Sequence, residues 1–67
     1  MKTLDLEYIK NRRQELNLSQ QYIANKLGFK NASTYLKYET GEYAIKAEML
    51  PILSQVLKTD IKNFFIK

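Results

Sequence analysis

Apolar residues recur every three or four positions along most of this chain, which is the spacing of helices that bury one face. Leu6, Ile9 and Arg13 lie on a common face of the first such segment, and most residues between them are polar. This pattern predicts a first helix over residues 5–16, with one side packed and the other in water.

A second helix has clear signals at both ends. Ser19 suits its N-cap position, because the side-chain oxygen can accept a hydrogen bond from a backbone N–H of the first turn. Ile23 and Leu27 follow at helical spacing and form a buried stripe. Gly28 stands where a helix end needs a positive φ angle, so we expect this helix over residues 19–27.

A third helix is expected over residues 32–40. Asn31 can cap its start, and Gly41 ends it. Tyr35 and Tyr38 are three positions apart and face inward, which leaves a mostly polar outer face.

Two further helices complete the chain. Residues 47–57 carry apolar side chains at the helical period, and Pro51 fits there only near the first turn, because proline lacks an N–H. Asp60 caps a short fifth helix over residues 60–65. With two glycines and one proline in 67 residues, the chain is predicted to be one all-α domain over residues 1–67.

Composition excludes several kinds of site. The chain has no cysteine and no histidine, so it has no disulfide, no thiolate or imidazole metal ligands and no histidine-activated nucleophile. Seven scattered carboxylates without a glycine-rich phosphate loop do not make a catalytic centre. We therefore expect no enzyme activity, no cofactor and no small-molecule ligand, and core packing alone must stabilise the fold.

The charge balance gives a weak indication of the partner. Eleven Lys and Arg oppose seven Asp and Glu, for a net charge of +4, and small basic domains often bind nucleic acid. No apolar run reaches the roughly 18 residues of a membrane span, and residues 1–5 lack the apolar stretch of a signal peptide. The expected location is the bacterial cytoplasm, on the nucleoid and away from the membrane.

The second and third helices form the arrangement that carries the function. A short helix, a tight glycine turn and a second short helix with a polar outer face make a helix-turn-helix. Ala24 lies where the two helices would cross and is small enough for close approach, and Gly28 supplies the turn. The second helix of the pair then has a width that fits the DNA major groove.

The stretch from Leu18 to Gly28, LSQQYIANKLG, resembles the signature of the phage repressor and Cro type of helix-turn-helix domain, the XRE family. The resemblance continues through Tyr35, Glu39 and Gly41, then through the segments at 50–57 and 60–65, and covers residues 6 to 65. The nearest likeness is to small regulators of phages and mobile elements.

The resemblance implies a compact five-helix, lambda-repressor-like fold whose second and third helices bind double-stranded DNA. Arg13 and Glu39 match a pair that joins the first helix to the end of the third. The positions expected at the DNA are Gln20, Gln21, Lys30, Asn31, Ala32, Ser33, Thr34, Leu36, Lys37, Tyr43 and Lys46. The turn after Gly28 is one residue longer than the commonest spacing, which leaves the register of Asn31 and Ala32 open by one position.

Several roles have two interpretations. Ser33 and Thr34 either read DNA or cap the first turn of the third helix. Phe64, Phe65 and Ile66 either close the core or contribute to a weak homodimer that forms fully on DNA. The protein as a whole is either a Cro-like repressor on a palindromic operator or a protein-interaction module of the same fold, with an antitoxin or antirepressor partner. Binding that weakens steeply with salt favours DNA.

Overall fold

The computed structural model describes residues 3–66. Within these residues the α-helices are α1 (Leu6–Glu15), α2 (Gln20–Lys26), α3 (Ala32–Glu39) and α4 (Leu50–Val56). Two short 3-10 helices, η1 (Ala47–Met49) and η2 (Ile61–Phe64), flank α4, and two short strands, β1 (Thr3–Leu4) and β2 (Phe65–Ile66), pair antiparallel.

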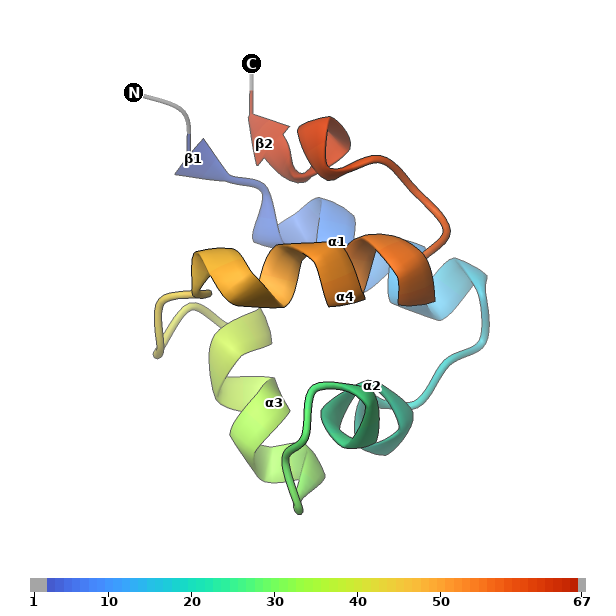
Figure 1. The fold of residues 1–67 in the computed structure, drawn as a ribbon, viewed down its shortest axis with the longest axis vertical. Helices are drawn as coiled ribbons and strands as arrows, with labels where there is room; N and C mark the ends of the chain where they lie inside the picture. Colours follow the sequence, from blue (N-terminus) through green and yellow to red (C-terminus); the bar gives the residue numbers. More distant parts are fainter. Residues whose placement is uncertain (1–2, 67) are drawn as a thin grey trace.

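The helices surround one apolar core. In Figure 1, α4 crosses in front of α1, α2 and α3 lie together below them, and the strand pair lies at the opposite end of the molecule. Every α-helix contributes to the buried cluster, which consists of Ile9, Ile23, Ala24, Tyr35, Tyr38, Met49, Leu53, Leu57 and Phe64. The α2–α3 unit therefore packs against α1 and α4.

Local signals in the sequence set the starts of α1 and α2 and the turn that follows α2. The Asp5 side chain accepts a hydrogen bond from the Tyr8 N–H, and the Ser19 hydroxyl accepts one from the Tyr22 N–H at 3.0 Å. The second contact confirms the predicted cap. Gly28 has the expected positive φ of 87°, in the left-handed region that glycine enters without strain.

The predicted helix over residues 47–57 is divided in two. A continuous helix from residue 47 would require Pro51 to donate to the carbonyl four residues earlier, and proline has no N–H. Instead η1 makes one 3-10 turn and α4 begins at Leu50, so Pro51 falls in the first turn of α4, where no donor is needed.

The fifth helix predicted over residues 60–65 does not form as an α-helix. Only the 3-10 turn η2 forms there, and the Asp60 side chain makes no capping hydrogen bond. The backbone becomes extended at Phe65 (φ −106°, ψ 139°), because β2 pairs with β1 in the register Thr3 with Ile66 and Leu4 with Phe65. None of the helices described is both long and apolar enough to cross a lipid bilayer.

Candidate nucleic-acid interface

The outer face of α3 is the main exposed surface of the helix-turn-helix. Tyr35 and Tyr38 point into the core, as predicted. The opposite face of α3, extended by its C-cap residue, consists of Ser33, Leu36, Lys37 and Thr40, which are all exposed and share helical spacing. Packing on one face thus orients a row of mainly small or polar side chains away from the protein.

The structure settles the register of α3. Asn31 occupies the N-cap position and Ala32 is the first helical residue. The longer turn is accommodated by Phe29, whose N–H bonds the Ala24 carbonyl at 2.8 Å and whose ring stacks on Tyr38 with centroids 5.4 Å apart. The additional turn residue therefore leaves the packing of α3 against the core intact.

The prediction that Asn31 caps α3 through its side chain is wrong. Asn31 makes no side-chain capping hydrogen bond. Instead the Gln21 side chain reaches across the turn, and its Oε1 accepts a hydrogen bond from the Ala32 N–H at 3.2 Å. Neither Ser33 nor Thr34 acts as the N-cap, because the helix begins before both of them.

The loop after α3 is tied to the outer face of the helix. The Tyr43 N–H donates to the Lys37 carbonyl at 3.0 Å, and the Tyr43 ring packs edge-on against Tyr38. The Lys37 ammonium lies 3.5 Å from the Tyr43 hydroxyl and 5.3 Å from the centre of its ring. Lys46 is exposed at the N-cap of η1. Lys37 is thus held beside the helix, at the edge of the exposed face.

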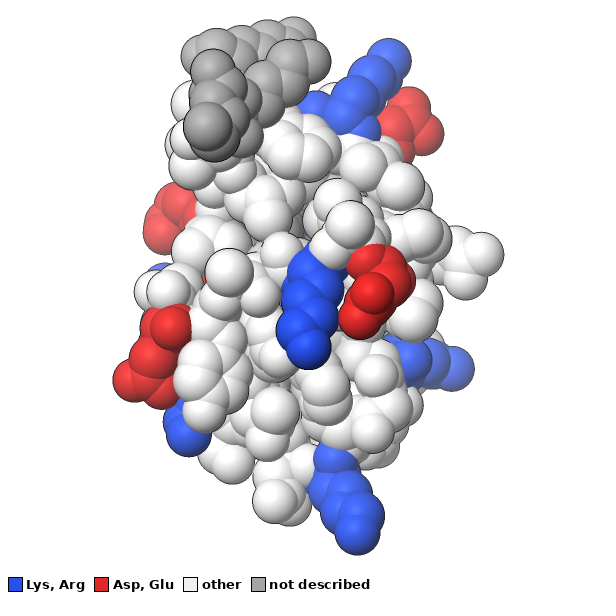
Figure 2. Space-filling view, turned by 60° about the vertical axis from the view of Figure 1, so that its left-hand side comes forward, with Lys and Arg blue, Asp and Glu red and all other residues white. Residues whose placement is uncertain are grey.

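Positive charge is dispersed on the side that carries this loop. In Figure 2, lysine and arginine side chains stand singly among neutral side chains, and acidic side chains lie close to some of them. Dispersed charge gives a weaker long-range attraction to phosphates than a continuous basic patch would. Hydrogen bonds and apolar contacts from neutral residues must therefore supply much of any recognition on this face.

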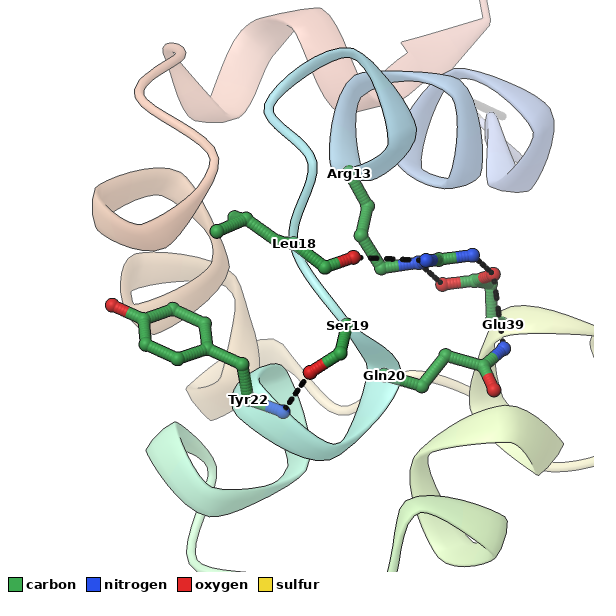
Figure 3. A network of polar contacts seen from close by, with 6 residues as sticks. All are labelled: Arg13, Leu18, Ser19, Gln20, Tyr22 and Glu39. Carbon is green, nitrogen blue, oxygen red and sulfur yellow. Dashed lines mark hydrogen bonds and ion pairs between the residues drawn. The ribbon is translucent and has the colours of Figure 1, made fainter.

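A buried ion pair fixes α1 against the end of α3, as predicted. The Arg13 guanidinium donates to both carboxylate oxygens of Glu39 at 2.9 Å and to the Leu18 carbonyl at 3.0 Å (Figure 3). The two side chains are only 11% and 4% exposed. Gln20, at the start of α2, also points its amide at Glu39, with Nε2 3.5 Å from Oε1.

Burial and pairing act in opposite directions on the titration of this network. Burial alone would raise the pKa of Glu39, but the hydrogen bonds and positive charge of Arg13 outweigh it, so the pKa of this carboxyl lies below its ordinary value. Hydrogen bonding to Glu39 likewise raises the pKa of Arg13. Glu39 is therefore ionised at neutral pH, and its ion pair with Arg13 fastens α1 to the end of α3.

The predicted DNA-binding residues gather on α3 and at its two ends. Ten of the eleven lie on α2, the turn, α3 or the following loop, and Lys46 lies at the start of η1. Gln20, Ala32 and Thr34 are half-buried, and the exposed members are Gln21, Lys30, Asn31, Ser33, Leu36, Lys37, Tyr43 and Lys46. Their contact with DNA stays a prediction.

Sequence reasoning missed two residues of this surface. Thr40 is the last residue of the predicted helix over 32–40, and it lies on the outer face of α3, seven positions after Ser33. Lys10 and Glu7 of α1 line a groove with Leu36 and Thr40, so Lys10 lies beside the outer face of α3. The seven-residue spacing could have identified Thr40, whereas Lys10 depends on how α1 packs against α3.

The three candidate dimer residues differ in how far their side chains are exposed. Phe64 is fully buried in the core, so its side chain is not available to a partner and its expected dimer role is wrong. Phe65 is half-buried, and Ile66 is 52% exposed.

A protein-family model described as helix-turn-helix matches residues 9–64 of the chain. Searches of curated proteins and of solved structures give no match. The matched region begins inside α1 and ends with η2, so it contains the α2–α3 unit, the Arg13–Glu39 pair and the loop that carries Tyr43.

Proposed function

This chain belongs to the XRE-type helix-turn-helix family of DNA-binding domains, and we propose that it is a Cro-like repressor that binds a palindromic operator as a dimer. The observation that carries this proposal is the exposed outer face of α3, which is polar except for Leu36 and is backed by the buried Tyr35 and Tyr38. We place the protein among the small regulators of phages and mobile elements, acting on the nucleoid, because its motif resembles theirs.

The proposed mechanism is steric. An α-helix with its side chains is about 10–12 Å across and fits the roughly 12 Å wide major groove. With α3 in the groove, the start of α2 and the loop after Gly41 approach the phosphates on either side. Leu36, which offers no hydrogen bond, contacts a thymine methyl group in this arrangement. A protein bound in this way blocks access to the DNA that it covers.

Two copies are required for useful specificity. One α3 contacts only a few base pairs, which is too short a site to compete with the roughly 10⁶–10⁹ other sites of a genome. A two-fold dimer places two recognition helices about 34–36 Å apart, one DNA turn, and so requires an imperfect palindrome. The partly exposed Phe65 and Ile66 at the C-terminal end offer a small apolar interface, so we expect a dimer that forms fully only on DNA.

The test is a selection from random duplexes followed by titration of the selected operator. We expect a palindromic motif, two chains per duplex and mostly monomeric protein in sedimentation without DNA. Affinity should fall by a factor of about 10³–10⁵ between 50 and 200 mM salt if six to ten phosphates are contacted, and less for fewer contacts. One chain per complete operator would exclude the dimer. Failure to enrich any motif, together with salt-insensitive binding to a protein, would favour the interaction module instead.

Base readout by Lys37 gives a second measurable effect. Lys37→Ala should weaken binding to the selected operator by about 1–3 kcal/mol and relax the preference at one or two base pairs, because a lysine at the groove face donates to guanine O6 and N7. Lys62→Ala is the matched control, since it removes an exposed lysine of η2 that lies outside the helix-turn-helix. An unchanged motif at unchanged affinity for Lys37→Ala would remove Lys37 from the readout.

A further inference from the structure

The ring of Tyr43 is held in one place beside the end of α3. The Tyr43 N–H donates to the Lys37 carbonyl at 3.0 Å, which ties the loop to the last turn of the helix. The ring packs at 73° against Tyr38, with the two ring centroids 5.4 Å apart, and Tyr38 in turn stacks on Phe29. One backbone contact and one aromatic contact therefore fix the ring relative to α3, although Tyr43 itself is 44% exposed.

The ammonium group of Lys37 lies over this ring. Its Nζ is 5.3 Å from the ring centroid, within the roughly 6 Å over which an aromatic face attracts a cation. The Tyr43 hydroxyl is 3.5 Å from the same nitrogen, which is the long limit for a hydrogen bond, so the ring face contributes more than the hydroxyl. A lysine has a flexible four-carbon stem that otherwise samples many directions. The ring thus restricts the ammonium group to one side of α3.

We propose that Tyr43 is a positioning residue that presents the Lys37 ammonium group to a guanine in the major groove. The inference rests on the proposed function. An ammonium group has three donors, so one faces the Tyr43 hydroxyl while two remain for O6 and N7 of the guanine. Because the Lys37 side chain is already ordered in the free protein, it loses less conformational freedom when it bonds the base. Tyr43 thereby increases specificity without touching the base.

Lys37 is the side chain of α3 that can make this contact. It is the only cationic residue between residues 32 and 39. Within residues 3–66, one other lysine lies over an aromatic ring, and that pair joins Lys26 to Tyr22 on α2. A guanine preference that depends on a lysine held over a ring at the end of α3 therefore identifies the pair of Lys37 and Tyr43.

The experiment is selection from random duplexes by five proteins in parallel: the wild type, Lys37→Ala, Tyr43→Leu, Tyr43→Phe and Tyr22→Leu. The wild type should select a guanine at one position of each half-site. Lys37→Ala should lower the preference for that guanine by about tenfold. Tyr43→Leu should lower it by about two- to fivefold, the strength of an exposed cation–π contact, although Lys37 is present. Tyr43→Phe should keep most of the preference, because the ring remains.

Tyr22→Leu is the matched control. Tyr22 is 43% exposed, nearly the same as Tyr43, and the Lys26 Nζ lies 5.4 Å from its ring centroid. Its substitution removes a cation–π contact of the same geometry from α2, so this variant should select the wild-type motif.

Two further measurements separate positioning from general stability. The Tyr43→Leu, Lys37→Ala double variant should lose no more preference at the guanine than Lys37→Ala alone, because Tyr43 acts only through Lys37. Thermal unfolding of each variant checks that the domain is folded during selection. A variant that is less stable but folded should bind with the wild-type preference at this position, so a merely structural role of Tyr43 would not change the motif.

The outcomes distinguish this inference from the proposed function. A wild-type motif that Lys37→Ala leaves intact would overturn the role of Lys37. Loss of the guanine preference in Lys37→Ala but not in Tyr43→Leu would overturn the role of Tyr43, and so would an equal loss in Tyr22→Leu. Equal weakening of binding to all sequences by Tyr43→Leu would make Tyr43 a phosphate contact instead. If the wild type itself enriches no motif, the proposed function fails, and the inference fails with it.

Discussion

Glu39→Gln is expected to lower the free energy of unfolding by about 3–5 kcal/mol, because it leaves the guanidinium of Arg13 buried without its counter-charge. A chain of 67 residues has a total stability of roughly 0.05–0.15 kcal/mol per residue, so this loss brings the domain close to unfolding at room temperature. Urea denaturation measures it directly. The double-mutant cycle with Arg13→Met should give a large coupling energy, and the absence of coupling would show that the pair does not stabilise the fold.

A milder variant keeps the experiment informative if Glu39→Gln does not fold. Arg13→Lys retains the positive charge but cannot donate to both carboxylate oxygens and to Leu18 in the same planar geometry. It should be destabilised by less than Glu39→Gln. Exposed pairs are worth only about 0–1 kcal/mol, so a loss in that range for both variants would contradict the buried character of this pair.

The same pair predicts a dependence of stability on pH. The pKa of Glu39 is lower in the folded protein than its ordinary value of about 4.3, so its contribution is complete above that value. The contribution is lost as the pH falls through the folded pKa, where the carboxylate becomes protonated. The difference in unfolding free energy between the wild type and Glu39→Gln should therefore shrink on acidification below about pH 4. A difference that stays constant down to pH 2 would contradict this assignment.

The parts of the fold that follow from neighbouring residues could be predicted from the sequence. Ser19 bonds the N–H three residues ahead, and Gly28 has a positive φ, because both signals act within one turn of chain. The strand pair could not be predicted in the same way. Two residues are too short to show an alternating pattern, and β1 finds its partner β2 about sixty residues away in the chain.

The same distinction between local signals and tertiary contacts applies to the candidate site. The outer face of α3 follows from the inward spacing of Tyr35 and Tyr38, so Ser33, Leu36 and Lys37 were found on it. The bridge made by Gln21 was missed, because a glutamine side chain has many rotamers and its partners exist only once the longer turn has closed. The side-chain cap predicted from the residue type of Asn31 does not form, and the only side chain that bonds the N–H of Ala32 comes from another helix.

The second prediction with a large expected effect concerns the C-terminal segment, where two apolar residues close together in the sequence differ in burial. Phe64 is fully buried and Ile66 is 52% exposed. Phe64→Ala should destabilise the domain by about 3–5 kcal/mol at every protein concentration, through lost burial and the cavity that remains. Ile66→Ala should change the stability of the monomer by less than about 0.5 kcal/mol, as is usual for surface positions.

DNA titration then distinguishes a core role from an interface role. If Ile66 lies at the dimer interface, Ile66→Ala should bind an isolated half-site like the wild type but lose cooperativity on the full operator, since only the second event requires protein–protein contact. Phe64→Ala, where it remains folded, should keep that cooperativity, because its side chain does not reach the surface. Unchanged cooperativity for Ile66→Ala would remove Ile66 from the dimer interface.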